Sequence, residues 1–473
     1  MSKYKFILEK QDKNARSGTI KTSLGEIKTP AFMPVATQGA IKSTPINIIE
    51  EIGYEMILSN TYHNILRPGL KIIKEFTNLS KFMDWNKPIL TDSGGFQVMS
   101  LSKLRKITKK GVIFQSHIDG SSHELTPENV VETQNIIGSN IQMVLDECTP
   151  FPSSHNDAEK SMNLSLEWAE RARKTYLNSK KKSDAQFGIV QGGIYEDLRI
   201  KSSLETINID FDGYAVGGLA VGEGHEKMVE VLKYTVPTLP DDRVRYLMGV
   251  GKPENIIEAV SEGIDIFDCV IPTREGRHGH AYYKNGTLNL KNKIFENDNR
   301  PLDESSNFSF SNRFSRGYIH HLIKSKEPLG GLIISSHNLN YYKNFMTDMR
   351  KSIESGKFED FKEAFYFNRD SSWFNSWLLT AELSSDISRS ILSEFISSFS
   401  VLTASTHSSV SIPAAAHTSL PATSGVSFSA GLRILIFSEI VSFILSTVEQ
   451  ELKRIRKNDI DKNLLRFKNI KKI

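Results

Sequence analysis

The sequence predicts an α/β protein whose main part is a (β/α)8 barrel. About eight short apolar runs in the first 280 residues indicate buried strands. Segments of helical periodicity separate several of these runs, and strands that alternate with helices indicate βαβ units in a parallel sheet. Because about eight such units fit within fewer than 300 residues, we expect a closed barrel and not an open sheet.

Apolar residues dominate the predicted strands, and most strands end at a polar residue, a glycine or a proline. In chain order, the strands are expected at 31–35, 56–60, 88–92, 141–146, 187–191, 213–217, 245–249 and 264–271. Helices are expected at 156–179, 198–208 and 253–262. Residues 111–124 alternate apolar and polar side chains, which indicates a hairpin inserted into the barrel.

Polar residues and glycines stand at the carboxyl ends of the predicted strands. The clearest are Asp92, Asp146, Gln191 and Asp268, together with the glycine pairs at 94–95, 192–193 and 217–218. In this kind of barrel, active sites lie at the carboxyl ends of the strands. Turn formation alone does not explain a ring of such residues from five or six strands, so the sequence predicts an active site there.

The last predicted strand has the strongest functional pattern. Burying a lone carboxylate is costly, so Asp268 must pair or take part in chemistry. Arg274 and Arg277 follow Pro272 in an expected loop, where guanidinium groups could hold phosphate or a guanine edge. For this stretch alone, the alternative is an aspartate that caps its own loop beside two solvated arginines.

Four motifs together resemble those of the tRNA-guanine transglycosylases. They are TDSGGFQ at 91–97, GIVQGG at 188–193, GGLAVGE at 217–223 and FDCVIPTREGR at 267–277. The resemblance extends from the N-terminus to about Phe367 and keeps the order and spacing of the motifs. Members of that family replace the guanine at the wobble position of certain tRNA anticodons with a deazaguanine, on a modified TIM barrel.

The resemblance implies a role for each site residue. Breaking a glycosidic bond passes through an oxocarbenium-like state that two carboxylates can serve, and the family pattern makes Asp268 the covalent nucleophile and Asp92 the general acid/base. Asp146, Gln191 and backbone groups of Gly218 and Leu219 match base-edge contacts. The substrate-binding residues are then Asp92, Ser93, Gly94, Gly95, Phe96, Asp146, Gln191, Gly218, Leu219 and Met248, with Phe96 and Met248 on the two sides of the base.

RNA contacts are expected from local groups of residues, because a few well-placed cations suffice for phosphate binding. The RNA-binding residues are Gly249, Val250, Gly251, Lys252, Pro253, Glu254, Asn255, Thr273, Arg274, Glu275, Gly276 and Arg277.

The resemblance also indicates which base is inserted. Cys148 and Val221 match bacterial members that use preQ1, the aminomethyl precursor of queuosine. The expected partners are therefore a tRNA with guanine at the wobble position, preQ1 or guanine, and a second copy of the chain in a homodimer.

The chain departs from the family at its zinc site. Family members have Cys-x-Cys-x-x-Cys and a later His that hold a structural zinc, whereas this chain has Ser306, Phe308 and Ser311, with only His337 retained. A serine hydroxyl stays protonated and phenylalanine cannot ligate, so a tetrahedral N/S site cannot form. We expect no zinc and no other cofactor. The subdomain at about 295–350 is expected to fold by packing of its phenylalanines.

Composition and charge are those of an ordinary globular protein. Hydrophobic residues make up 39% of the chain and charged residues 24%, with a net charge of +4. Residues 453–473 hold nine Lys/Arg against two Asp, so the basicity belongs to the C-terminal end. Cys148 and Cys269 cannot form a disulfide framework and suit a reducing cytosol. With no signal peptide pattern at the N-terminus, we expect a cytoplasmic protein.

Three regions of different composition are expected. The transglycosylase-like barrel covers 1–368, a Ser-rich low-complexity linker covers 369–431, and an amphipathic helix with a basic tail covers 432–473. Serine takes 19 of the 61 positions from 371 to 431. Glu439 interrupts an apolar run too short to cross a bilayer, so the helix is expected on a membrane surface or on a partner that the sequence does not identify.

Three functions compete at this stage. The first is an active enzyme that inserts preQ1 into tRNA in queuosine biosynthesis, and the retention of Asp92 and Asp268 favours it. The second is a non-catalytic tRNA-binding partner subunit, which the missing zinc ligands suggest. The third is a barrel-shaped glycoside hydrolase, but Arg274, Arg277 and only four tryptophans argue against it.

Overall fold

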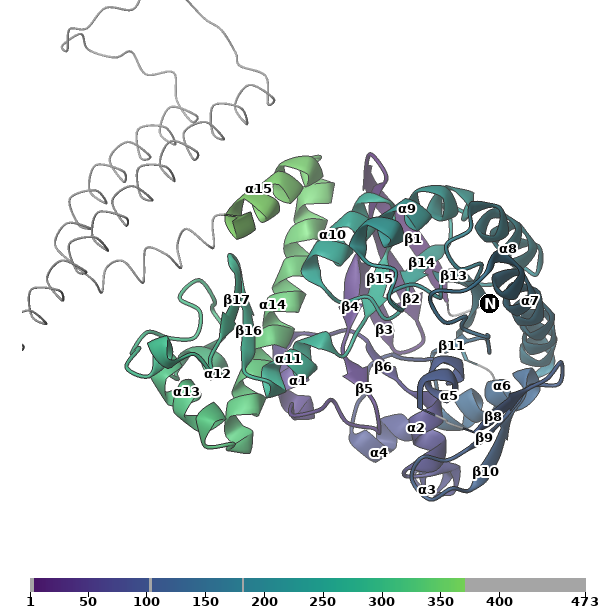
Figure 1. The fold of residues 1–473 in the computed structure, drawn as a ribbon, viewed down its shortest axis with the longest axis horizontal. Coiled ribbons are helices and arrows are strands. Elements are labelled where there is room, and N and C mark those ends of the chain that lie inside the picture. Colours follow the sequence, from purple (N-terminus) through teal and green to yellow (C-terminus); the bar gives the residue numbers. More distant parts are fainter. Residues whose placement is uncertain (1–3, 102–103, 181–182, 371–473) are drawn as a thin grey trace, which may run out of the picture. The chain divides into compact units, whose positions relative to one another are not determined.

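The computed structural model describes residues 4–101, 104–180 and 183–370, and Figure 1 shows their arrangement. The predicted linker at 369–431, except for its first two residues, and the predicted helix and tail at 432–473 lie outside these residues. Among the described helices, none is long and apolar enough to cross a membrane.

The predicted barrel is confirmed. Within the described residues, the central sheet has the order β4-β15-β14-β13-β12-β11-β7-β6-β5, and every pairing is parallel. Its strands are β4 (Ala31–Met33), β5 (Val35–Ala36), β6 (Ile57–Ser59), β7 (Ile89–Thr91), β11 (Ile141–Met143), β12 (Ala185–Val190), β13 (Gly213–Val216), β14 (Val244–Leu247) and β15 (Ile266–Asp268). Each overlaps a predicted strand, although the last strand was predicted to extend to residue 271 and ends at Asp268.

The sheet closes because β4 and β5 are two parts of one strand. Pro34 alone separates them, and its missing N–H interrupts the ladder at that point. β4 pairs with β15 while β5 pairs with β6, so the two edges of the sheet meet in the same segment. The strands are buried on both faces, as in β12, where all six residues are buried.

Helices surround the barrel as Figure 1 shows. Those that follow the strands are α1 (Ile46–Ile52), α2 (Thr61–Leu66), α3 (Leu70–Glu75), α4 (Leu79–Met83), α5 (Gly95–Leu101), α6 (Pro127–Ile137), α7 (His155–Asn178), α8 (Glu196–Asn208), α9 (His225–Thr235) and α10 (Pro253–Ser261). The predicted helices at 156–179, 198–208 and 253–262 are confirmed as α7, α8 and α10. Pro253 stands in the first turn of α10, where its missing N–H costs no hydrogen bond.

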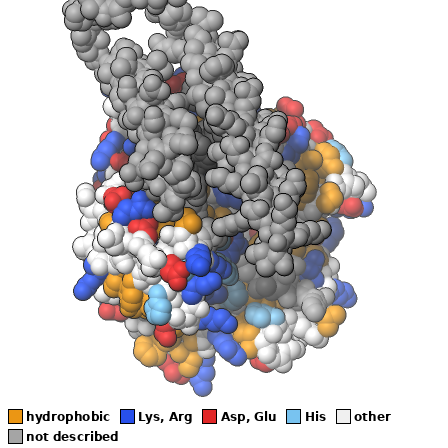
Figure 2. Space-filling view, turned by 60° about the vertical axis from the view of Figure 1, so that its left-hand side comes forward, with side chains coloured by type: hydrophobic (Ala, Val, Ile, Leu, Met, Phe, Trp, Pro, Cys, Tyr) orange, Lys and Arg blue, Asp and Glu red, His pale blue; other side chains and the backbone are white. Residues whose placement is uncertain are grey.

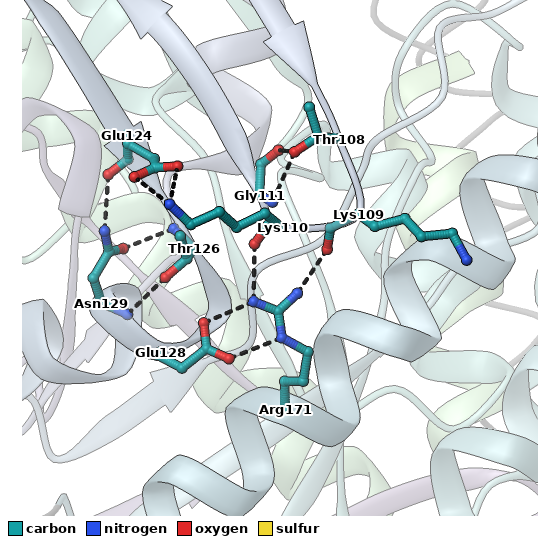
Figure 3. Close-up of polar contacts among 9 residues, drawn as sticks. All are labelled: Thr108, Lys109, Lys110, Gly111, Glu124, Thr126, Glu128, Asn129 and Arg171. Atoms are coloured by element: carbon teal, nitrogen blue, oxygen red, sulfur yellow. Dashed lines mark hydrogen bonds and ion pairs between the residues drawn. The ribbon is translucent and has the colours of Figure 1, made fainter.

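The predicted hairpin is confirmed and has a third strand. β8 (Arg105–Ile107), β9 (Val112–Gln115) and β10 (Ser122–Leu125) form an antiparallel sheet. Figure 3 shows how Arg171 of α7 holds it: the guanidinium donates to the carbonyls of Lys109 and Lys110 at 2.6 and 2.9 Å and pairs with both oxygens of Glu128 at 2.8 Å. One arginine therefore joins the β8–β9 turn to α6 and α7.

An N-terminal antiparallel sheet was not predicted. It consists of β1 (Lys5–Asp12), β2 (Ala15–Thr22) and β3 (Gly25–Thr29). Arg16 of β2 lies 3.2 Å from the carboxylate of Asp265, which immediately precedes β15, and donates to the carbonyl of Arg243, immediately before β14. These contacts place the sheet at the amino ends of the barrel strands, opposite the predicted site.

One prediction about the last strand is wrong. β15 ends at Asp268, and α11 (Ile271–Arg277) begins three residues later, so Arg274 and Arg277 lie on a helix and not in a loop. Pro272 suggested a stop, but it occupies the first turn of α11, where proline fits without losing a hydrogen bond. A Cβ at Gly276 would stand 2.6 Å from the backbone nitrogen of Ser335, so α11 packs closely on α14 (Pro328–Glu354).

The C-terminal subdomain lies beside α14, as Figure 1 shows. It contains β16 (His280–Tyr283), β17 (Gly286–Asn289), α12 (Ser309–Asn312) and α13 (Arg316–Lys324), and α15 (Phe358–Asp370) ends the described chain. The ring of Phe310 lies 5.9 Å from that of Phe308 and 6.2 Å from that of Phe314, between ring centroids. Phe310 and Phe314 border an apolar cluster that includes Leu302 and Ile319.

Candidate active site

Asp92 is a buried carboxylate immediately after β7. The backbone N–H of Thr61 donates to its Oδ1 at 2.9 Å, and the side-chain amide of Asn60 donates to its Oδ2. Burial raises the pKa of Asp92 to about 7, against the hydrogen bond from Thr61, and the charge of Asp268 adds to the increase. Asp92 can therefore both give and accept a proton near neutral pH.

Asp268 ends β15 and is held through one oxygen only. The hydroxyl of Tyr246 and the backbone N–H of Gly249 donate to its Oδ1 at 2.5 and 2.8 Å. In the described part of the chain, no group donates to its other oxygen, Oδ2. Burial raises the pKa of Asp268, while the two hydrogen bonds lower it. This arrangement keeps one oxygen fixed and leaves the other available.

Asp146 and Gln191 form an acid–amide pair at the ends of β11 and β12. The amide nitrogen of Gln191 donates to Oδ2 of Asp146 at 2.7 Å, and Ser93 lies 3.4 Å from Oδ1. Burial raises the pKa of Asp146 to about 6, against these two hydrogen bonds. The side-chain oxygen of Gln191, Oε1, is buried and has no hydrogen-bond partner among the described residues, so it is left as an acceptor for a ligand.

Glycines bring the backbone close to this pair. A Cβ at Gly218 would stand 2.4 Å from Oε1 of Gln191, and one at Gly95 would stand 2.6 Å from the carbonyl oxygen of Asp146. Gly218 also has a φ of +67°, which favours glycine. Phe96 follows Gly95 in the first turn of α5, and it is 45% exposed. An exposed ring beside buried polar groups suits a flat heterocycle.

Comparison with known proteins identifies the family. The family model described as queuine tRNA-ribosyltransferase matches residues 11–371. Proteins named queuine tRNA-ribosyltransferase from Rickettsia rickettsii (strain Sheila Smith), Rickettsia massiliae (strain Mtu5) and Rickettsia bellii (strain OSU 85-389) are each 51% identical over 361 residues. The aligned segment covers 76% of this chain and 99% of each relative.

The chain belongs to the queuine tRNA-ribosyltransferase family. This family consists of tRNA-modifying glycosyltransferases, and the predicted resemblance is thereby confirmed. The family match ends at residue 371, close to the last described residue.

The residues predicted to contact RNA differ in their exposure to solvent. Gly249, Lys252 and Arg274 are exposed, Glu254, Asn255, Glu275 and Arg277 are partly exposed, and Val250, Gly251, Pro253, Thr273 and Gly276 are buried. Burial lowers the pKa of Arg277, and the neighbouring charge of Arg274 lowers it further. Two guanidinium groups that repel each other favour a bound anion between or beside them.

At the positions expected to hold the family's zinc ligands, three side chains of this protein form hydrogen bonds instead. Nε2 of His337 lies 2.7 Å from the carbonyl oxygen of Tyr282, so this nitrogen bears the proton. Nδ1 therefore accepts from the hydroxyl of Ser311 at 3.2 Å. Ser306 accepts from the amide of Asn340 at 3.3 Å, and Phe308 is buried. This donor set offers one imidazole and no thiolate, so it does not fit a tetrahedral zinc ion.

Sequence reasoning missed two groups that hold the carboxylates. Asn60 ends a predicted strand and Thr61 follows it. Asn60 also caps α2 by accepting from His63, so its position could have suggested a role. Tyr246 lies inside β14, where nothing separates a functional tyrosine from a core residue. Glu223, the last residue of the GGLAVGE motif, was noted as a strand-end acid without a role, and its carboxylate accepts from the backbone N–H groups of the three residues before it.

Proposed function

We propose that this chain replaces the guanine at the wobble position of a tRNA anticodon with preQ1, as a base-exchange enzyme of queuosine biosynthesis. The main support is the difference between the two aspartates, of which Asp92 is buried and Asp268 is partly exposed. Asp92 is held through both oxygens and has a pKa of about 7, whereas Asp268 is held through Oδ1 alone. The queuine tRNA-ribosyltransferase relatives carry the corresponding activity in their names.

In the first half of the proposed reaction, Oδ2 of Asp268 attacks the ribose carbon. A C–O bond forms as the C–N bond to guanine breaks, and Asp92 gives its proton to the departing base. In the second half, preQ1 attacks the same carbon, the ester bond to Asp268 breaks, and Asp92 takes a proton from the incoming base. Tyr246 and Gly249 stabilise the carboxylate of Asp268 each time it leaves.

Recognition of the base is assigned to Asp146, Gln191 and the backbone at Gly218 and Leu219. The unpartnered oxygen of Gln191 supports this assignment, since it is a buried acceptor that a base N–H would satisfy. Arg274 and Arg277 are assigned to the RNA. On the face that comes forward in Figure 2, Lys and Arg side chains gather near the middle, as an RNA backbone requires. We further propose that the enzyme acts without zinc.

The deciding experiment is covalent trapping. Wild-type enzyme incubated with tRNA and guanine should yield an enzyme–RNA adduct on a denaturing gel and should incorporate labelled guanine. Asp268→Ala removes the attacking oxygen, so we expect loss of the adduct and of incorporation by a factor of at least ~10³. Undiminished exchange by this variant would contradict the assignment of the nucleophile.

A further inference from the structure

Arg199 is a fully buried arginine on α8, immediately behind the base pocket. Its Nη1 donates to the carbonyl of Val190 at 2.9 Å and to that of Gly217 at 2.8 Å, and its Nε donates to the carbonyl of Gly193 at 2.8 Å. Val190 ends β12, whereas Gly217 follows β13. One guanidinium therefore joins the two loops that present Gln191 and Gly218.

The contacts of this arginine within the described ranges are with backbone carbonyls. No carboxylate among the described residues forms an ion pair with it, and burial lowers the pKa of Arg199 to about 10, so it remains a cation at neutral pH. Keeping a charge in the interior costs free energy, which three carbonyl contacts and the more distant charge of Glu223 offset only in part. Simple packing does not require this cost, because an apolar side chain would fill the same space.

The surroundings of Arg199 connect it to base recognition. Its Nη2 and Oε1 of Gln191 are both buried, and neither has a hydrogen-bond partner in the described ranges. Both approach Gly218, where a Cβ would stand 3.6 Å from Nη2 and 2.4 Å from Oε1. The backbone N–H of Gln191 also donates to Ser202 of α8 at 3.0 Å. Helix α8 thus fixes Gln191 through its backbone and Gly217 through Arg199.

We propose that Arg199 is a positioning residue for base recognition. It orients the peptide groups around Gly217 and the end of β12, so that Gln191 and Gly218 meet the base in one fixed arrangement. Fixing these groups before binding removes an ordering cost that the base would otherwise have to offset. The inference rests on the proposed base exchange, because it assigns the base to this pocket.

The test compares guanine binding with tRNA use. Arg199→Lys keeps the charge, but one ammonium group cannot reproduce the guanidinium fork that reaches three carbonyls. We expect the Kd for guanine, measured by calorimetry without tRNA, and the KM for guanine to rise about tenfold or more. The KM for tRNA should change by less than about twofold. Arg199→Gln, which keeps two N–H donors without the charge, should change the same quantities in the same direction.

Arg350→Lys is the matched control. Arg350 is also buried and donates to a carbonyl, that of Pro30 at 2.6 Å, but it lies on α14 beside β3 and β4. The substitution Arg350→Lys should lower the Tm without changing the Kd for guanine. Unchanged guanine binding by folded Arg199 variants, or an equal loss in Arg350→Lys, would overturn the role of Arg199. Failure of the wild-type protein itself to bind guanine would instead contradict the proposed base exchange, and this inference with it.

Discussion

At the scale of single residues, the site places two chemically identical side chains, Asp92 and Asp268, in different surroundings. Burial raises the pKa of both Asp92 and Asp268. Donors to both oxygens immobilise Asp92, whereas Asp268 keeps an oxygen without a donor among the described residues. Two acids in different surroundings are what a reaction with one nucleophile and one proton carrier requires.

The pKa of Asp92 leads to a prediction about stability. Folding raises this pKa from about 4 to about 7, so the folded state binds the proton more tightly than the unfolded state does. The resulting stabilisation is complete below about pH 4 and is lost as the pH rises through about 7. Asp92→Asn cannot ionise, so the variant does not lose this stabilisation. Between pH 5 and pH 8, the Tm of the wild type should therefore fall relative to the Tm of the variant.

The measurement is a series of thermal unfolding curves from pH 5 to pH 8. The slope against pH is the informative quantity, because the asparagine also changes the hydrogen bonds to Asn60 and Thr61 by an amount that does not depend on pH. Asp119→Asn serves as the control, since hydrogen bonds with nearby serines lower the pKa of Asp119 to about 2. Parallel curves for Asp92→Asn and wild type would show that Asp92 is ionised throughout this range.

At the scale of helices and strands, sequence patterns predicted the barrel strands well because apolar runs and their polar ends coincide with βα units. The N-terminal sheet was missed because β1 has no buried residue, so it lacks the alternation that marks a strand. Helix α11 was missed because its proline and glycine resemble a loop. Its helical form depends on packing against α14, a contact between distant parts of the chain that no local pattern contains.

Helix α11 presents two cations in its last turn, and this arrangement leads to a prediction about RNA affinity. Arg274→Ala and Arg277→Ala should each raise the KM for tRNA and leave the Kd for guanine unchanged. A base-edge contact is worth about 1–3 kcal/mol, and each lost phosphate contact should lower the slope of log K against log salt by about 1.

The salt titration compares these variants with Lys13→Ala. That substitution removes the same charge from the turn between β1 and β2, where the side chain of Lys13 is 71% exposed. Because this turn belongs to the N-terminal sheet at the other end of the barrel, we expect the wild-type salt slope. If all three variants gave that slope, the RNA would lie elsewhere.

At the scale of the whole molecule, the subdomain that holds zinc in the family is packed here through other contacts. The hydrogen bonds from Ser311 through His337 to Tyr282 involve two of the four ligand positions, and the ring of Phe308, at a third position, packs against that of Phe310. The absence of the three cysteines can be seen in the sequence itself. The tautomer of His337 was not predictable, because it depends on the carbonyl of Tyr282, which is 55 residues away in the chain.

The purified protein should therefore contain no stoichiometric zinc, and a chelator should leave its Tm unchanged, because no metal binding energy contributes to folding. Elemental analysis with unfolding curves checks this. The combined substitution Ser306→Cys, Phe308→Cys and Ser311→Cys should bind one Co²⁺ per chain and show the absorption of tetrahedral thiolate coordination. One zinc per wild-type chain, with a Tm that falls in chelator, would contradict the proposal.

Barrel closure at Pro34 has a consequence for how the protein is made. β15 lies between β14 and β4, so the strand that bears Asp268 is also the strand that joins the beginning of the barrel to its end. During synthesis it leaves the ribosome after every other barrel strand, and until then β4 and β14 remain open edges. A nascent or truncated chain that lacks it has neither a closed barrel nor Asp268, the proposed nucleophile. The proposed attack on the ribose therefore requires the same strand that closes the barrel, so a chain without a closed barrel also lacks the proposed nucleophile.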